Sequence, residues 1–404
     1  MRRWCGRCST PKSNSSYTTA IVPWMRGGCL EKLHELVEIL VRVATGHGAD
    51  ACHSAAAFPF GRGLGTAPTA EPSRPVPPAP PPAPAQAAAR QNSGLPNAFA
   101  LPSSGGEKIF DPALRGYVHG FRQGDAPIAD PLARQRWSAA RAEVMASILR
   151  AIAASPWAAH LVLRGSATMP AWVGDAARRP GDLDWVVLPD TWASDSAEAE
   201  SLLDEFIAAI AAHGVAAGEA TIDVGHVAVD EIWTYERAQG KRLTFSWTVP
   251  GLPPGKLQCD FVFRETLWAP PVPLALPAPS GDAIPLQAAG PEQSLAWKVL
   301  WLMTDRYPQG KDLYDAVLLS RCVSLSPEMA AQVLKALHNA WYTPDSFDKW
   351  VRNSSDWVLE QVGDVQWQDF RKEHPWVDAD VEAWISAFRK AVAPVDALIV
   401  ELRA

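Results

Sequence analysis

The chain has 404 residues, 48% hydrophobic and 20% charged, a composition that excludes a fibrous or wholly disordered protein. Residues 1–106 carry 10 Lys or Arg against 5 Asp or Glu, so the net charge of −7 leaves −12 on the remainder, which argues against broad affinity for nucleic acid. No apolar run approaches the roughly 20 residues of a membrane span and no signal peptide is visible, so we expect a cytoplasmic protein without a membrane partner.

Residues 1–106 are expected to form a largely disordered leader. Residues 54–106 consist mainly of Ala, Pro, Gly and Ser, which favour extended polyproline II and cannot bury a core. One amphipathic helix is predicted over 30–45, where apolar residues recur at helical spacing. Cys5 and Cys8 permit a redox dithiol or a zinc site, but no strand precedes them and no second close pair completes four ligands. We therefore favour a leader without such chemistry.

An α/β domain is predicted over 107–267. Its two expected helices cover 132–154 and 196–213, and the second ends at a glycine that can cap it. Apolar runs and period-two alternation predict its strands, and the alternation in the last three indicates an antiparallel meander. The predicted strands are 161–163, 183–188, 222–235, 241–249 and 256–263.

The remainder of the chain is predicted to be helical. Residues 268–291 are rich in Pro and Ala and are expected to be a connection, which leaves an all-helical domain over 292–404. The predicted helices are 292–304, 311–321, 326–340, 345–360 and 378–402. The expected fold is therefore of the α+β class, with a mixed-sheet domain followed by a helical one.

Two neighbouring features of the α/β domain are suited to phosphate chemistry. Gly165 and Ser166 end one predicted strand, where glycine lets backbone N–H groups approach a phosphate and serine adds a hydroxyl donor. Asp182 and Asp184 head the next strand, and side chains at i and i+2 lie on one face, close enough to share a cation. Mg²⁺ would offset the repulsion of the two carboxylates, because it prefers carboxylate oxygens and substrate phosphates.

A third acid, Asp260, lies in the middle of an apolar predicted strand. An unpaired carboxylate would be costly there. If this strand neighbours the strand of Asp182 and Asp184, three carboxylates converge and can hold two metal ions for displacement at phosphorus. The alternative is that Asp260 lies on the polar face of a half-exposed strand.

The order of these elements resembles that of a known superfamily. Gly-Ser, then Asp-x-Asp on the next strand, then a single Asp on a later strand is the order of the polymerase-β-like nucleotidyltransferase fold. The wider pattern consists of Leu161 to Met169, an Arg at 178 or 179, a helix with Glu292 and Lys298, and Lys311-Asp312-Leu313-Tyr314-Asp315. With it, residues 155–320 resemble the AbiEii/AbiGii toxin-type nucleotidyltransferases.

The chain also departs from that family pattern. Family members usually have Lys-Gly-Gly where this chain has Arg164-Gly165-Ser166. Pro170 falls early in the helix expected after the glycine turn, a place where proline is tolerated but affects the geometry of the phosphate cradle.

The resemblance implies roles for residues of the helical part. It gives Lys298 a triphosphate-binding role, and this amine lies on the apolar face of its predicted helix, where it needs an anionic partner. Asp315 matches a functional acid of the family, whereas Asp312 is equally compatible with a capping role at the helix start. Arg178 and Arg179 either brace the metal loop, contact phosphate or are solvated, and Arg179 is our candidate for the nucleotide contact.

The function implied by the resemblance is that of an Mg²⁺-dependent, phosphorus-transferring enzyme. It would move a nucleoside monophosphate from an NTP to an acceptor, with an RNA or tRNA 3′ end expected, as the toxin of a toxin–antitoxin or phage-defence system with a separately encoded antitoxin. Asp260 would also help to activate the acceptor hydroxyl. The residues expected to bind two Mg²⁺ ions are Asp182, Asp184 and Asp260, and those expected to hold the triphosphate are Gly165, Ser166 and Lys298.

Two other function classes stay open. An NTP-binding protein without transfer is one, although the presence of all three acids argues against it. An antibiotic-type transferase with a small hydroxylated acceptor is the other. Most of the tryptophans in the helical part are expected in the core, and the alternative for any one of them is stacking on a base of an RNA end.

Overall fold

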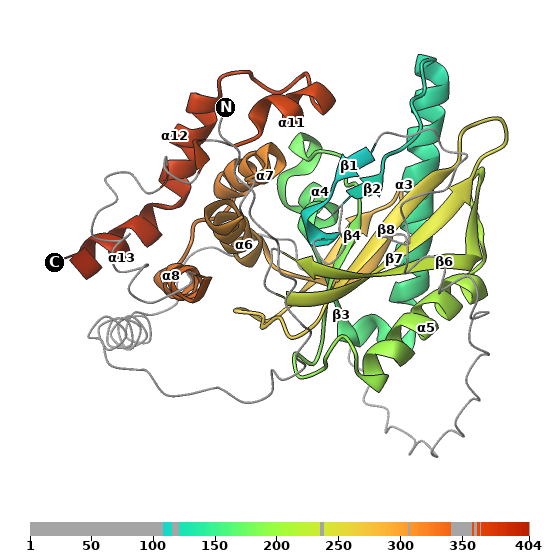
Figure 1. The fold of residues 1–404 in the computed structure, drawn as a ribbon, viewed down its shortest axis with the longest axis horizontal. Coiled ribbons are helices and arrows are strands. Elements are labelled where there is room, and N and C mark those ends of the chain that lie inside the picture. The colour runs from blue at the N-terminus through green and yellow to red at the C-terminus, as the bar shows by residue number, and fades with distance from the viewer. Residues whose placement is uncertain are drawn as a thin grey trace, which may run out of the picture.

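The computed structural model describes residues 108–114, 121–234, 238–305, 308–340, 358, 362–363 and 365–403. The leader expected over 1–106, with its helix and its cysteine pair, lies outside the described residues, and so does most of the helix predicted over 345–360. Figure 1 shows a mixed α/β molecule in which a broad sheet lies beside a group of helices.

The centre of the molecule is an eight-stranded mixed sheet with the order β5-β6-β7-β8-β4-β3-β10-β9. Strands β6, β7 and β8 form the predicted antiparallel meander, and β8 then pairs in parallel with β4. A separate two-stranded sheet joins β1 (Lys108–Phe110) to β2 (Phe121–Gln123). The strands of the large sheet are β3 (Leu161–Arg164), β4 (Leu183–Val187), β5 (Ala216–Ala217), β6 (Ala220–Thr234), β7 (Ala238–Thr248), β8 (Gly255–Val262), β9 (Val272–Pro277) and β10 (Ala283–Ala288).

Two long helices cover one face of this sheet (Figure 1). Helix α3 (Pro131–Ala153) begins at Asp130, whose carboxylate accepts the N–H of Ala133 at 2.9 Å, and helix α5 (Ala197–His213) ends at Gly214 with φ 116°. Both confirm the predicted helices. Their apolar side chains pack on one set of alternate strand residues, such as Leu163, Trp185 and Phe261. The strand residues between them project to the opposite face of the sheet.

That opposite set meets α6 (Pro291–Thr304). Val162 and Val186 of the central strands pack against Trp297 and Trp301 of this helix. The helix therefore covers the sheet over β3 and β4, at the point where the two predicted parts of the chain meet. Short helical segments complete the α/β part: η1 (Pro112–Leu114), η2 (Pro156–His160), η3 (Gly165–Thr168), α4 (Met169–Val173) and η4 (Gly174–Ala176).

The stretch 268–291 differs from the expected connection, because it contains strands β9 and β10. They form a hairpin, and β10 pairs in parallel with β3. The apolar residues Leu274, Leu276, Ile284 and Leu286 are buried at alternate positions, while the prolines between them are more exposed. A high proline content therefore concealed a period-two pattern.

The described elements that follow β10 are all helices. They are α6, α7 (Gly310–Ser320), α8 (Pro327–Ala340), α11 (Trp367–Glu373), α12 (Val381–Ala391) and α13 (Ala393–Arg403). The single helix predicted over 378–402 is wrong, because it is divided at Val392. Pro394 has no N–H for the carbonyl of Lys390 and its ring would clash with it, so a new helix begins instead. Among the described helices, none combines the length and apolar character that crossing a membrane requires.

Candidate active site

Four charged residues lie in one row across the central strands. Arg164 is directly opposite Asp184. Asp184 is opposite Asp260, and Asp260 is opposite Arg242 on β7. Residues in register project to the same face of the sheet, here the face away from α3 and α5. Across the four strands, two acids therefore lie side by side with an arginine on either side of them. The expectation that the strand of Asp260 neighbours that of the acid pair is confirmed.

The turn after β3 is built around Gly165. Its φ is 72°, and a Cβ placed on it would lie 2.4 Å from Oδ2 of Asp184, so a glycine is required on both counts. Ser166 is buried, and its hydroxyl donates to Oδ1 of Asp182 at 3.4 Å. Pro170 lies in the first turn of α4, where it removes no helical hydrogen bond. The sequence therefore places the Gly-Ser turn against the acid pair.

The acids of this site have opposite electrostatic environments. Burial raises the pKa of Asp184 to about 8, and the negative charges of Asp182 and Asp260 add to the shift against the opposing Arg164 and Lys311. Burial also acts on Asp182, but Lys311, Arg178 and then more distant cations outweigh it and lower the pKa. At neutral pH and without a cation, Asp184 is therefore largely protonated, and a bound cation would favour its charged form.

Asp260 is held by an arginine. Nε and Nη2 of Arg242 each donate to one oxygen of Asp260 at 2.7 Å, and both side chains are buried. Burial raises the pKa of Asp260 in spite of this opposing charge. Asp260 is therefore neither unpaired nor on a solvated face, and Arg242 offsets part of the cost of its burial.

The donor chemistry of the acids fits a divalent cation, with one qualification from geometry. Asp182 and Asp184 are half-buried carboxylates, and Mg²⁺ is commonly bound by one or two carboxylates plus substrate phosphates. A positive ion would offset the charge that raises the pKa of Asp184. Within the part of the chain that the structure describes, however, no group of three His, Cys, Asp or Glu is arranged to hold a metal, and both oxygens of Asp260 accept hydrogen bonds from Arg242.

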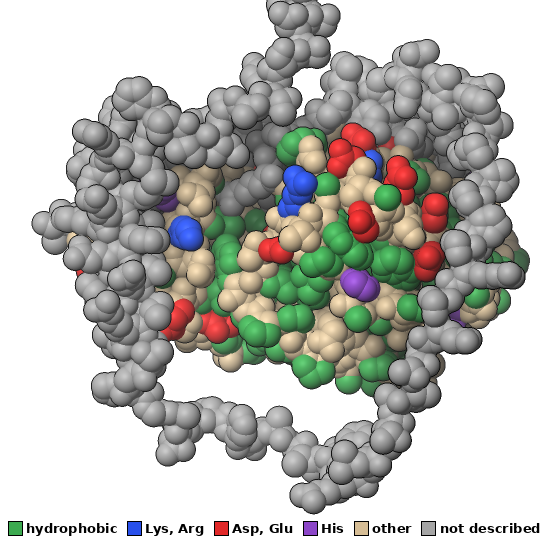
Figure 2. All heavy atoms as spheres, turned by 90° about the horizontal axis from the view of Figure 1, so that it is seen from below, with side chains coloured by type: hydrophobic (Ala, Val, Ile, Leu, Met, Phe, Trp, Pro, Cys, Tyr) green, Lys and Arg blue, Asp and Glu red, His purple; other side chains and the backbone are tan. Residues whose placement is uncertain are grey.

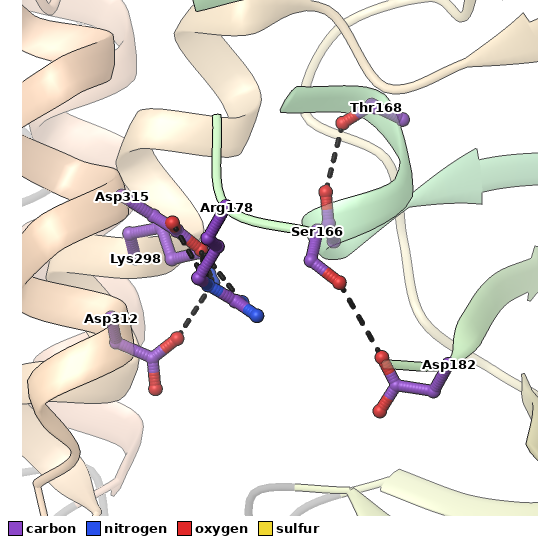
Figure 3. Close-up of polar contacts among 8 residues, drawn as sticks. Ser166, Thr168, Arg178, Asp182, Lys298, Asp312 and Asp315 are labelled. Carbon is purple, nitrogen blue, oxygen red and sulfur yellow. Dashed lines mark hydrogen bonds and ion pairs between the residues drawn. The ribbon is translucent and has the colours of Figure 1, made fainter. Parts of the chain in front are cut away.

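A second charged cluster joins α6 and α7 (Figure 3). Nζ of Lys298 lies 2.6 Å from Asp312 and 3.1 Å from Asp315, and Arg178 donates to Asp315 at 2.9 Å. All four side chains are at most 11% exposed. Burial opposes ionisation, yet Arg178 and Lys298 lower the pKa of Asp315, and Asp312 and Asp315 raise that of Lys298. This cluster balances its own charges.

This geometry changes two expectations about basic residues. The anionic partners that Lys298 needs are Asp312 and Asp315, so a substrate is not required to explain its burial. Arg179 bonds to Ser138 of α3, whereas the charge of Arg178, which is bonded to Asp315, reaches Asp182; Arg178 is therefore better placed than Arg179 to act on the acids. In Figure 3 the Lys298 cluster lies on one side and Ser166 with Asp182 on the other.

The structure also brings in residues that sequence reasoning missed. Arg164 is 1% exposed, donates to Glu265 at 2.6 Å, and its guanidinium carbon lies 5.2 Å and 5.5 Å from the ring centroids of Trp297 and Trp301. These two tryptophans are core residues, as expected for most of them. The signal in the sequence was the single arginine at the end of the apolar run Leu161–Arg164, since a buried cation implies a buried acid. Arg242 follows Lys241 in a strand with many polar residues and gave no such signal.

Comparison with known proteins agrees with this geometry. The model of a family described as "Nucleotidyl transferase AbiEii toxin, Type IV TA system" matches residues 147–393, well over half of the chain. A search of curated proteins gives no match. The matched region contains the Gly-Ser turn, the row of acids on β4 and β8, and the Lys298 cluster. The chain therefore belongs to the AbiEii family of nucleotidyl transferase toxins of type IV toxin–antitoxin systems.

Proposed function

We propose that the protein transfers a nucleoside monophosphate from an NTP to a hydroxyl acceptor, with Mg²⁺ bound by Asp182 and Asp184 and a second ion shared with Asp260. The observation that carries this proposal is the close approach of Gly165 to Asp184, which puts the Gly-Ser turn directly beside a carboxyl whose pKa is raised. Bound Mg²⁺ would neutralise the phosphate charge that develops during displacement.

Residues of the chain bind the phosphate, accept the proton of the acceptor and orient the accepting carboxylate. Ser166 and the backbone N–H groups of its turn bind phosphate oxygens. Asp260, whose carboxylate has a pKa raised by burial, accepts the proton of the acceptor hydroxyl more readily than an exposed carboxylate would. Arg242 fixes the orientation of that carboxylate through two hydrogen bonds.

Three basic residues support the triphosphate in this proposal. Lys311 lies in the first turn of α7, where its charge reaches both Asp182 and Asp184, and it makes no hydrogen bond or ion pair within the described ranges. Its ammonium is thus available to a phosphate. Arg178 faces the site from the second cluster, and Lys298 acts through Asp315, which holds Arg178 in place.

The acceptor and the biological role are proposed from family membership. We propose an RNA acceptor, with a tRNA 3′ end as the first candidate, and a growth-arresting or phage-defence role in the cytoplasm, restrained by a separately encoded antitoxin. On the face shown in Figure 2, Asp and Glu gather on one half and basic side chains are few. That half is unsuited to a polyanion, so we expect RNA to approach from another side.

The test is to incubate the full-length protein with Mg²⁺, total RNA and each α-labelled NTP in turn. We expect label on RNA with one preferred nucleotide, and none with the Asp182→Ala/Asp184→Ala protein. Equal labelling by this variant would refute the assignment. Saturable NTP binding without any label would favour a binding-only role, and label on an added aminoglycoside but not on RNA would favour a small acceptor.

A further inference from the structure

Arg242 is shared between two carboxylates, of which only one belongs to the strands of the site. Two of its nitrogens hold Asp260, and the third, Nη1, donates to Oδ2 of Asp111. All three residues are at most 8% exposed. The five N–H groups of a guanidinium permit this arrangement, in which one cation bridges two acids.

Asp111 is brought to the sheet by the N-terminal segment of the described structure. It follows β1 directly, and its Oδ1 accepts the N–H of Ala113 at 3.1 Å, which caps the short η1. The fully buried Leu114 anchors η1, which packs against β6. This segment precedes residues 147–393, so the family match does not include it.

The charges of the trio leave one negative charge in excess. Asp111 and Asp260 contribute two negative charges and Arg242 one positive charge, while Arg122 lies at 3.6 Å from Asp111 and is one-third exposed. Without Asp111, the charge of Arg242 would act on Asp260 alone. The site would then present less negative charge to a cation beside Asp260.

We propose that Asp111 is a positioning residue of the active centre, which divides the charge of Arg242 so that Asp260 stays both oriented and able to share a cation. This inference rests on the proposed function, in which Asp182, Asp184 and Asp260 bind Mg²⁺. Residues 108–114 are then part of the active centre, and their role is not limited to stabilising the fold around it.

The test measures Mn²⁺ binding to the full-length protein by electron paramagnetic resonance of the free ion, without nucleotide. Asp111→Asn, which keeps the shape but removes the charge, is expected to weaken Mn²⁺ binding about tenfold, whereas Asp111→Glu retains affinity within about twofold. Asp125→Asn is the matched control, because Asp125 also precedes the region of the family match but pairs with Arg141 at the surface.

A structural role alone predicts a different pattern. In nucleotide transfer, Asp111→Asn should raise the Mg²⁺ concentration needed for half-maximal rate about tenfold and retain most of the rate at saturation. If Asp111 only anchored η1, the variant would melt at a lower temperature with a lower saturated rate and an unchanged Mg²⁺ requirement. That pattern, or unchanged Mn²⁺ affinity, overturns the proposal.

Two further variants separate the possible failures. If Asp182→Asn/Asp184→Asn binds Mn²⁺ as the unmodified protein does, or if neither binds it, the proposed metal site is wrong and the inference falls with it. If that variant loses Mn²⁺ and Asp111→Asn does not, only the inference is wrong. Should Asp111→Asn fail to fold, Arg242→Lys serves instead: a lysine cannot hold both oxygens of Asp260, so we expect a transfer rate at least about tenfold lower without weaker Mn²⁺ binding. A transfer rate equal to that of the unmodified protein would overturn the inference.

Discussion

The two charged clusters of this protein differ in how completely they balance themselves. On α6 and α7, Lys298 and Arg178 face Asp312 and Asp315, and burial does not prevent the shifts that favour the charged form of Lys298 and Asp315. On the strands, the pKa values of Asp184 and Asp260 are raised instead. Burial alone therefore does not identify a reactive site: the helix cluster has as many cations as acids, whereas the strand cluster shifts two of its acids towards the neutral form.

The largest expected effect comes from removing the acids of the strand cluster. Asp182→Ala/Asp184→Ala should lower nucleotide transfer on the order of a thousandfold or more, because both proposed metal ligands are lost. Stability should not fall, since repulsion within the row decreases. Transfer assays and thermal melts of the same preparations check both statements. A strongly destabilised variant would show that the charges of the strand cluster stabilise the fold as those of the helix cluster do.

A substitution in the helix cluster should lower the free energy of unfolding. Lys298→Met leaves Asp312 and Asp315 buried with one cation fewer, and breaking a buried pair in this way costs about 3–5 kcal/mol. Urea denaturation measures the free energy of unfolding. Lys372→Met, which removes an exposed lysine paired with Asp369, is the control and should leave the free energy of unfolding nearly unchanged. Equal effects of the two variants would contradict the contrast.

Gly165→Ala tests whether nucleotide transfer depends on the close approach of the turn to Asp184. The added Cβ would displace the carboxylate of Asp184 and would strain a backbone with φ 72°. We expect transfer to fall about a hundredfold, the cost of a misplacement of about 1 Å at a reacting centre. Gly251→Ala has a similar φ of 76° with open space around its Cβ, so it reports the backbone strain alone. If both variants behave alike, the contact with Asp184 is irrelevant.

Lys311→Ala is the most selective of these changes. Loss of one charge-assisted contact to phosphate should raise KM for the NTP about tenfold, with a smaller effect on kcat. Arg179→Ala removes a basic residue that bonds to Ser138 away from the acids, and should leave KM within about twofold. Steady-state kinetics at saturating Mg²⁺ distinguishes the two. A larger rise in KM for Arg179→Ala would restore Arg179 as the nucleotide contact.

Much of the strand cluster could be predicted because its information is local. Asp182 and Asp184 share a face by strand periodicity, and Gly165-Ser166 marks the turn that meets them. Neighbouring strands then bring Asp260 into register. The partners of these residues could not be predicted in the same way. Arg242 reaches Asp260 only through the pairing of β7 with β8, and Asp111 approaches from a segment 131 residues away along the chain.

The helix cluster and the edge of the sheet also contain features that could not be predicted from the sequence alone. The sequence identifies Lys298 as a buried amine in need of an anion, but the packing of α6 against α7 decides that Asp312 and Asp315 supply it. At the edge, prolines concealed β9 and β10, because a strand tolerates proline wherever the ladder does not need its N–H. Contacts that depend on tertiary pairing are not encoded in the local pattern of the sequence.

The prolines of β9 have a consequence for how the protein behaves in a crowded solution. An open sheet ends in edge strands whose free backbone groups can recruit a strand from another molecule and start aggregation. Strand β9 lies at one end of the eight-stranded sheet and carries Pro273 and Pro277. A proline offers no N–H to an incoming strand, so this edge is a poor template for further growth. The residues that made the segment look like a linker thus protect the protein from assembling with itself.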